Sequence, residues 1–475
     1  MEALTCLFEP RSVAVIGASG DPSKYGHRVM ESILDAGYKG PVYPVNPNLS
    51  EVLGRRTYPS IRDLPETVEL AFVVIPARAV LDAVRDCIAA GVKGIVVITA
   101  GFSEVGEEGR EAEREIARLC NEAGIPAVGP NCMGVVCFKS HLIGTMTMDR
   151  LQGEPGDVSF ISQSGTYGIS TLNQGLTAGV GFNKFVSTGN EAMTRFCDFL
   201  EYFGNDPETR VIIGYIESLK DAGRFVPVAR EASKKKPIIV MKFGRTEAGT
   251  RAAASHTGAL AGSRDIYAAA FKQSGVIEVT RTQDLLNMAV GFRTQPLPKG
   301  TRIGITGISG GFAVAASDYL AEHGLLVPEL SQSLQQRMRD ENIPPFAIVK
   351  NPIDLTAEIR PRFLLRCTEH LIKSDEVDAV IVGLWSYPLP PADESIRAFE
   401  RMQQESGKPL LLCYYGSRRG AELIQGMTRS LPVYGTPEEV CQVMAGMCQY
   451  AQYRRKTGTF PRCGSRPAMQ EKSDG

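Results

Sequence analysis

Short runs of β-branched and aliphatic residues alternate with longer amphipathic stretches along almost the whole chain. The short runs have the length and composition of buried strands, and the longer stretches repeat apolar residues at helical spacing. This alternation predicts an α/β fold with parallel sheets and crossover helices. The predicted strands are 12–16, 41–45, 70–75, 94–98, 126–128, 157–161, 182–186, 210–216, 237–242, 302–306, 377–384 and 409–414. Predicted helices include 78–90, 107–123 and 437–453, with others beginning at Gly165, Met193, Asp221 and Ser263.

The 475 residues are too many for one ordinary domain, and breaks in the pattern predict three. A first block closes near Gly134, a second opens at Gly156, and a proline-rich joint, 295–300, precedes the third. The predicted domains are 1–135, 150–294 and 299–455. The polar remainder, 456–475, is predicted to be disordered.

The second and third blocks open in the same way. Residues 157–165 (DVSFISQSG) and 302–311 (RIGITGISGG) each form an apolar strand, a Ser-Gly turn and the start of a helix. This weak internal repeat predicts two related flavodoxin-like domains.

Composition narrows the class of protein. Lysine plus arginine (52) nearly balances aspartate plus glutamate (53), so no global field favours nucleic acid or an anionic membrane. The chain has no apolar signal core and no run long enough to span a bilayer. Its eleven cysteines lack metal-ligand spacing and mostly lie in apolar runs. We therefore expect a cytoplasmic protein with reduced thiols and no metal site.

The first strand is followed by a glycine-containing turn and a predicted helix. Glycines let the backbone approach a ligand, and a helix N-terminus offers free N–H groups to a phosphate. The spacing is not GxGxxG, and Asn46-Pro47 after the second strand lacks the carboxylate that binds a ribose. A phosphate-bearing nucleotide other than NAD is predicted, with a plain strand–helix turn as the alternative. The candidate ligand-binding residues here are Gly17, Ala18, Ser19, Gly20, Lys24, Gly26, Asn46 and Pro47.

Three further loops follow strands of the same predicted sheet. The carboxyl ends of parallel strands line one crevice, so these loops should converge beside the glycine turn. Cys132 is a tempting nucleophile, but packing explains it better because no histidine is near it in sequence. The candidate residues in these loops are Ile75, Pro76, Thr99, Ala100 and Asn131.

His256 lies within a long segment of small residues, Gly244–Gly262. Such a segment can move, and a neutral imidazole is a competent nucleophile near pH 7. The segment alone also fits an ordinary loop histidine. Glu217, at the end of a predicted strand, is a candidate for orienting the imidazole, with a surface glutamate as the alternative.

The two Ser-Gly turns each place backbone amides at a helix N-terminus, where a phosphoryl group binds well. Together with a loop histidine they suggest a phosphohistidine site, although each alone is only a turn. No GxxxxGK[ST] loop is present, so ATP or ADP would need a domain from another chain. The candidate phosphate-binding residues are Ser164, Gly165, Ser309, Gly310 and Gly311.

From about residue 5 to 455 the chain resembles the alpha subunit of ADP-forming acyl-CoA synthetases (acetate–CoA ligase, ADP-forming), relatives of succinyl-CoA synthetase. The family order is a Rossmann-type CoA-binding domain and two flavodoxin-like domains. The motifs that carry the resemblance are Gly17-Ala18-Ser19, Gly129-Pro130-Asn131-Cys132, Ser162-Gln163-Ser164-Gly165, Ser187-Thr188-Gly189-Asn190-Glu191, Ser255–Gly262, Ser309-Gly310-Gly311 with Asp318, and Asn351–Leu355.

The resemblance implies the reaction acyl-CoA + phosphate + ADP ⇌ carboxylic acid + CoA + ATP, through an acyl phosphate and a phosphohistidine. His256 would carry the phosphoryl group, Glu217 would orient it, and the two Ser-Gly turns would hold phosphate. ADP or ATP with Mg²⁺ would bind mainly to an ATP-grasp beta subunit in a hetero-oligomer (alpha2beta2-like). The acid itself is not identified by the sequence.

The chain departs from the family pattern at His27 and Arg28, after the glycine turn, and at Met133 and Cys137 near the Asn131 loop. These departures affect the expected CoA contacts or acyl pocket and leave the catalytic residues in place. The alternative function is a non-catalytic CoA or acyl-CoA sensor or scaffold, which would need Gly17 and Asn131 but not His256.

Overall fold

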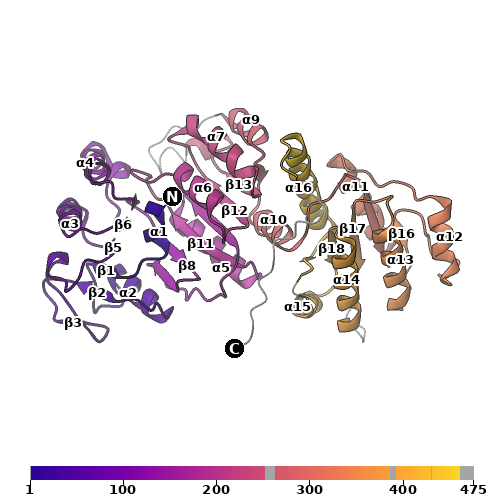
Figure 1. The fold of residues 1–475 in the computed structure, drawn as a ribbon, viewed down its shortest axis with the longest axis horizontal. Helices are drawn as coiled ribbons and strands as arrows, with labels where there is room; N and C mark the ends of the chain where they lie inside the picture. Colours follow the sequence, from indigo (N-terminus) through magenta and orange to yellow (C-terminus); the bar gives the residue numbers. More distant parts are fainter. Residues whose placement is uncertain are drawn as a thin grey trace. The chain divides into compact units, whose positions relative to one another are not determined.

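The computed structural model describes residues 2–251, 263–356, 358, 360–385, 392–428 and 430–460. The chain forms two compact units, of which the first comprises residues 1–295 and 430–434 and the second comprises 296–429 and 435–475 (Figure 1). Within the described residues, no helix is long and apolar enough to cross a membrane.

The first unit begins with a five-stranded parallel sheet in the order β2-β1-β5-β6-β7. Its strands are β1 (Val13–Ile16), β2 (Val42–Val45), β5 (Leu70–Val73), β6 (Gly94–Val97) and β7 (Ala127–Val128). The helices are α1 (Glu2–Phe8), α2 (Tyr25–Asp35), α3 (Ala77–Ala89) and α4 (Glu107–Ala123). Shorter elements are β3 (Glu51–Val52), β4 (Arg55–Arg56), η1 (Ile61–Asp63) and η2 (Ser103–Val105).

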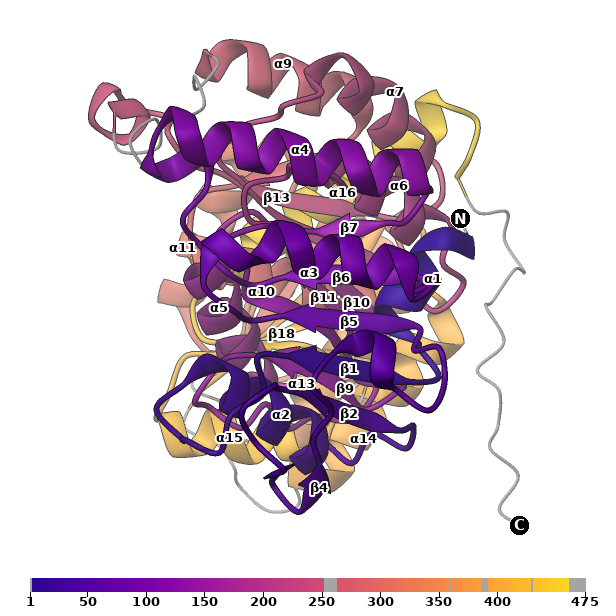
Figure 2. The same ribbon diagram turned by 90° about the vertical axis from the view of Figure 1, so that its left-hand side faces the viewer.

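Both faces of this sheet are buried because successive strand residues point to opposite sides. On β1, Ala14 and Ile16 belong to a core that also contains residues of α3 and α4, the helices lying across the near face in Figure 2. Val13 and Val15 belong to a second core on the other face, which includes α2 and extends into the next sheet. One continuous apolar core therefore joins two sheets into a single unit.

The second sheet of this unit has the order β14-β13-β12-β10-β11-β8-β9. It contains β8 (Gly134–Cys137), β9 (Leu142–Thr145), β10 (Val158–Ser162), β11 (Phe182–Ser187), β12 (Val211–Ile216), β13 (Ile238–Lys242) and β14 (Ile277–Val279). The five strands from β14 to β11 are parallel. The sequence predicts four of them, and β14 was not predicted. Its helices are α5 (Gly165–Thr177), α6 (Phe196–Asn205), α7 (Ala222–Ser233), α9 (Arg264–Ser274) and α10 (Thr282–Thr294).

The sequence analysis did not predict the antiparallel hairpin β8–β9 at the edge of this sheet. β8 pairs with β11 and β9 pairs with β8. The hairpin lies against the first sheet, so closely that a methyl group at Gly144 would lie 2.1 Å from Cζ of Phe72. The hairpin is therefore the point where one sheet packs on the other.

The predicted start of α6 was also wrong: the helix begins at Phe196, three residues after Met193. Residues 190–194 form a loop of turns and bends instead, because Asn190 N donates to Pro130 O (2.9 Å) and Thr194 N donates to Ala127 O (3.0 Å). Asp198 Oδ2 accepts from Arg195 N (2.8 Å) and so caps the start of the helix.

The second unit contains the third sheet, in which β15 (Ile303–Gly307) lies between β16 (Ile353–Asp354) and β17 (Ala379–Leu384), and β17 pairs with β18 (Leu410–Tyr414), all in parallel. Its helices are α11 (Gly310–Glu322), α12 (Gln332–Asp340), α13 (Pro361–Lys373), α14 (Ala392–Ser406), α15 (Arg418–Met427) and α16 (Pro437–Lys456). The two-residue strand β19 (Val433–Tyr434) belongs to the return segment of the first unit.

The predicted repeat is confirmed in the local structure, since β10 with α5 and β15 with α11 each form a strand, a Ser-Gly turn and a helix. Helix α16 ends at Lys456, beyond the predicted Tyr453. Most of the predicted tail, residues 461–475, lies outside the described residues.

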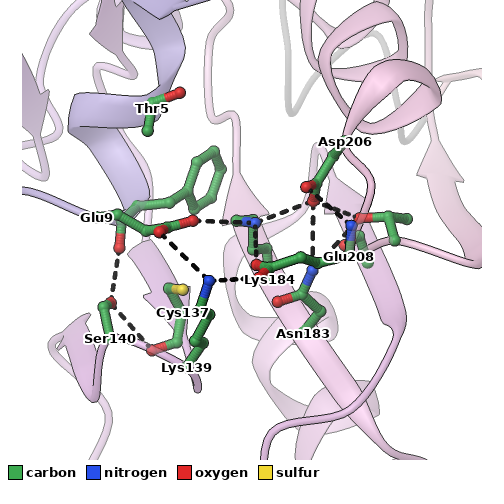
Figure 3. Close-up of polar contacts among 12 residues, drawn as sticks. Thr5, Glu9, Cys137, Lys139, Ser140, Asn183, Lys184, Asp206 and Glu208 are labelled. Carbon is green, nitrogen blue, oxygen red and sulfur yellow. Dashed lines mark hydrogen bonds and ion pairs between the residues drawn. The ribbon is translucent and has the colours of Figure 1, made fainter. Parts of the chain in front are cut away.

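A buried ion network ties the N-terminal segment to the second sheet (Figure 3). Lys184, on β11, has a side chain only 1% exposed, and its Nζ lies 2.9 Å from Asp206 Oδ2, 3.3 Å from Glu9 Oε1 and 3.5 Å from Glu208 Oε2. Burial opposes the charge of Lys184, but its hydrogen bond to the Asp206 carboxylate raises its pKa above the ordinary value. The amine is therefore a permanent cation that holds three carboxylates together.

We predict that Lys184→Met lowers the free energy of unfolding by about 3–5 kcal/mol, because it leaves the buried Asp206 carboxylate without its cation. Denaturant titration measures the change. The matched control is Lys139→Met, since Lys139 contacts Glu9 and Glu208 but is 53% exposed. That variant should lose less than about 1 kcal/mol. Equal losses in the two variants would contradict the buried cation's role.

Candidate functional site

The glycine turn after β1 lies against the loop after β5. Gly17 has a φ of 92°, and a methyl group there would lie 2.2 Å from the carbonyl oxygen of Val74. Only glycine fits this approach without displacing the neighbouring backbone. The turn therefore meets the β5 loop at the carboxyl edge of the sheet, where ligands bind in open parallel sheets.

Two side chains from other parts of the first domain hold the turn in shape. Asn46 Nδ2 donates to Ala18 O (2.8 Å), and Nδ1 of the buried His27 lies 2.9 Å from Ser19 O. Asn46, predicted as a ligand-binding residue, thus also supports the turn from within. His27, which departs from the family pattern, has the same supporting position.

The turn leads into α2, whose first residue follows Lys24. No side chain caps this helix end, and Lys24 is exposed beside it. Free amides and a cation at a helix N-terminus favour an anion. Of the other predicted residues near the turn, Ala18, Ser19 and Gly26 are buried, Gly17 is half-buried, and Gly20 and Pro47 are exposed.

The loops after β5, β6 and β7 are linked by hydrogen bonds. Thr99 Oγ1 donates to Ile75 O (2.7 Å), and Asn131 N donates to Thr99 O (2.9 Å). Pro76 and Ala100 are exposed at the same edge. The structure therefore brings the predicted loops together, and their binding of a ligand stays a prediction.

Cys132 is a packing residue. Its side chain is buried, and Sγ lies 3.3 Å from Val97 O. Burial raises the pKa of this thiol to about 12, so no appreciable thiolate exists near neutral pH. The sequence argument for packing over nucleophilic chemistry is supported.

The turn before α5 lies next to the Asn131 loop. Ser164 is the residue before the helix, its side chain caps no amide, and the first turn has no acidic residue. Met133 N donates to Ser187 Oγ (3.0 Å), and Met133 Cγ would lie 2.6 Å from a methyl group at Gly165. Met133 thus fills the space between the Asn131 loop and the helix end that is predicted to bind phosphate.

Glu217 is held by Gln163, the residue before that same turn. Gln163 Oε1 accepts from Glu217 N (2.6 Å) and Ser218 N (3.0 Å), while its Nε2 donates to Ser218 O (2.5 Å). The Glu217 side chain is buried, and its Oε1 accepts from Tyr215 Oη (3.1 Å). Lys242 Nζ donates to the backbone oxygen of Glu217 (2.8 Å). Glu217 is therefore buried and held in place. This excludes the alternative that it is an ordinary surface glutamate.

His256 lies outside the described residues, so its predicted contact with Glu217 stays a prediction. In the second unit, Ser309 Oγ accepts from Phe312 N (3.5 Å) at the start of α11. Gly310 is half-buried, Gly311 is exposed, and a methyl group at Gly310 would lie 2.9 Å from Asp354 Oδ2. Joint action of this helix start with that of α5 would involve both units and also stays a prediction.

The segment 187–191 is one of the family motifs, but no role for it was predicted from the sequence. In the structure this segment contains Glu191, a fully buried carboxyl whose Oε1 accepts from Thr188 Oγ1 (2.9 Å) and Phe196 N (3.2 Å). Burial raises the pKa of Glu191 to about 7, with the Asp221 charge adding to the shift and Gln163, Thr188 and Lys220 opposing it. The only sequence signal was an acidic residue inside an otherwise small and polar loop.

The fold and these loops define a protein with a CoA-binding domain joined to a ligase-type flavodoxin domain. Residues 11–137 match the family described as CoA binding domain, and residues 155–292 match the one described as Succinyl-CoA ligase like flavodoxin domain.

Relatives that match over nearly the whole chain identify the family more narrowly than the two domain matches do. The chain is 39% identical to the alpha subunit of acetate–CoA ligase [ADP-forming] II of Pyrococcus furiosus, over 94% of this chain and 98% of that protein. It is 35% identical to the alpha subunit of the isoenzyme I of the same organism, over 96% and 99%. A solved structure of Ca. Korarchaeum cryptofilum dinucleotide forming acetyl-coenzyme A synthetase 1, in complex with phosphate and ADP, matches with a TM-score of 0.89 at 35% identity, over 96% and 99%. The chain belongs to the family of ADP-forming acetate–CoA ligase alpha subunits.

The raised pKa of Glu191 predicts a pH-dependent stability. The folded protein holds this proton up to about pH 7, whereas the unfolded chain releases it near 4.5, so the free energy of unfolding should fall as pH rises between these values. Glu191→Gln removes the charge, and we expect it to raise stability above pH 7 by about 1–3 kcal/mol relative to wild type. Thermal unfolding at pH 5 and pH 8 measures this. A wild-type stability that does not fall more steeply than that of the variant would contradict the assignment.

Proposed function

We propose that this chain is the alpha subunit of an acid–CoA ligase that interconverts acyl-CoA, phosphate and ADP with carboxylic acid, CoA and ATP. Coenzyme A binds at the carboxyl edge of the first sheet, with its phosphates at the Gly17 turn, the α2 N-terminus and Lys24. The relative with bound phosphate and ADP supports the use of these ligands. The acid is a small carboxylate.

The observation that carries this proposal is the contact between two predicted sites. The Asn131 loop belongs to the CoA-binding domain, and its Met133 packs on Gly165 at the start of α5. A thioester delivered along this loop would therefore lie close to a phosphate held by the amides of α5. Adjacent thioester and phosphate sites are what phosphorolysis of an acyl-CoA needs.

The proposed reaction has three steps. A phosphate oxygen attacks the thioester carbonyl carbon, the C–S bond breaks, and CoA leaves as its thiolate to give an acyl phosphate. A ring nitrogen of His256 then attacks the phosphorus, and the carboxylate leaves with the bridging oxygen. The β-phosphate oxygen of ADP finally takes the phosphoryl group from His256 to form ATP. Glu217 accepts a hydrogen bond from the other ring nitrogen, which fixes the tautomer.

The nucleotide step belongs to a partner. The names of the relatives include the word alpha, which implies a separate beta subunit in those enzymes. We propose an ATP-grasp beta subunit that holds ADP with Mg²⁺, in a hetero-oligomer of two alpha and two beta chains. The segment containing His256 would travel between the two subunits.

The alternative, a CoA sensor without catalysis, is less well supported. A sensor has no need for a buried carboxylate fixed by a glutamine at the end of β12, yet Gln163 and Glu217 form such an arrangement. A sensor also has no use for a second Ser-Gly helix start at Ser309.

The test is phosphorylation of the protein. With its beta subunit and ³²P-labelled ATP, the wild-type chain should take up acid-labile, base-stable label, and His256→Asn should take up none. The matched control, His323→Asn, alters an exposed histidine at the end of α11 and should label normally. Label retained in His256→Asn would disprove the phosphohistidine step. CoA binding by a wild-type chain that is never labelled would favour the sensor.

A further inference from the structure

One segment of the second domain runs along the CoA-site loop of the first. Asn190 N donates to Pro130 O (2.9 Å), Ala192 N donates to Gly129 O (3.2 Å), and Thr194 N donates to Ala127 O (3.0 Å). In all three bonds the segment 190–194 donates its backbone N–H groups to carbonyl oxygens of residues 127–130. The loop that includes Asn131 is therefore shaped by the flavodoxin-like domain as well as by its own.

The side chain of Asn190 reaches the side chain of Asn131. Asn131 Nδ2 donates to Asn190 Oδ1 (3.2 Å), and Asn131 has a φ of 58°, in the left-handed region. A carboxamide has one donor end and one acceptor end, so its orientation depends on what each end meets. The orientation of Asn190 therefore decides which atom of Asn131 faces it.

Two carboxylates of the first domain fix the orientation of Asn190. Its Nδ2 lies 2.7 Å from Glu104 Oε2, 2.8 Å from Glu113 Oε2 and 3.1 Å from Ser103 Oγ, so the nitrogen end of the amide faces three acceptors of the first domain. The two nearest acceptors are carboxylates, and hydrogen bonds to charged groups are the stronger kind. Glu104 also accepts from Gly101 N (2.6 Å), in the loop after β6, and these hydrogen bonds, opposing its burial, lower the pKa of Glu104.

Lys220 completes the arrangement. Its Nζ donates to the backbone oxygen of Asn190 (2.5 Å) and lies 3.9 Å from Glu113 Oε1. The negative charges of Glu104 and Glu113 are thus partly balanced by this lysine, which lies in the loop after β12. The same loop carries Glu217. Asn190 is therefore contacted both by the loop that includes Asn131 and by the loop that carries Glu217.

We propose that Asn190 is a positioning residue for CoA: it orients the Asn131 carboxamide and so couples the CoA-site loop to the flavodoxin-like domain. This inference rests on the proposed function, in which Asn131 contacts CoA. Glu104 and Glu113 act through Asn190 by holding its nitrogen toward them. Asn190 itself need not touch the ligand.

The test is CoA binding to the full chain by calorimetric titration. Asn190→Ala removes the contact to Asn131, and Asn190→Asp places a third carboxylate against Glu104 and Glu113. Each should weaken CoA binding by about tenfold or more at pH 8, the loss expected for a charge-assisted hydrogen bond. The matched control, Asn121→Asp, makes the same change at an exposed position of α4 and should bind CoA as the wild type does.

The pH dependence of CoA binding distinguishes a positioning role of Asn190 from a merely structural one. In Asn190→Asp the new carboxyl faces Glu104, Glu113 and Lys220 and adjoins Glu191. As the pH falls from 8 to 6, a proton shared among these carboxylates restores a donor, so CoA affinity should recover relative to wild type. Asn190→Ala has no such donor and should show no recovery.

A second variant distinguishes the loss of positioning from a folding defect. Glu113→Gln leaves Asn190 in place but replaces one charged acceptor, and we expect weaker CoA binding of about threefold to tenfold with an unchanged unfolding temperature. If the wild type binds CoA and both Asn190→Ala and Glu113→Gln bind within twofold of it, the inference is wrong. If the wild type itself binds no CoA, the proposed function fails.

Discussion

The structure of the first unit depends on the hydrogen bonds between residues 127–131 and residues 190–194. These backbone bonds, with the apolar core that runs from β1 and β5 into the second sheet, make two domains into one body. The connection is made at the carboxyl edge of the first sheet, where the loops predicted to bind a ligand are. Packing and function are therefore constrained by the same few residues.

These hydrogen bonds fix the positions of the short loops at this edge of the sheet. The Asn131 loop is bonded to Thr99 on one side and to the segment after β11 on the other. Met133 then fills the space in front of Gly165. A shift of the second domain would move the Asn131 loop and the start of α5 together, so that the distance between the predicted CoA and phosphate sites is kept.

Sequence patterns predicted much of this fold because strands and helix starts are local features. Most parallel strands of the three sheets and the turns at Ser164 and Ser309 were recognisable from hydrophobic runs followed by small residues, whereas the short strands β14 and β16 were not predicted. The hairpin β8–β9 was not, because β8 pairs with β11 across 47 positions (Cys137 with Lys184) or more, and nothing local specifies that pairing. The loop before α6 was predicted as helix for the same reason: its hydrogen bonds are to residues far away in sequence.

The candidate site was predictable in part. Gly17, Asn131, Glu217 and Ser164 were found from their places after strands. The residues that hold them were not: Gln163 reaches Glu217 across 54 positions, and Asn190 reaches Asn131 across 59. Positions within a motif indicate that a residue matters, but only the folded chain shows what it supports.

We propose that CoA binds at the carboxyl edge of the first sheet and that the second domain shares this site. Hydrogen–deuterium exchange of the full chain with and without CoA measures this most directly. CoA should slow exchange at residues 17–27, 74–78, 99–102 and 129–134, and also at 187–194, with no change in β17 and β18. Protection confined to other segments, or protection of the first-domain loops with none at 187–194, would contradict it.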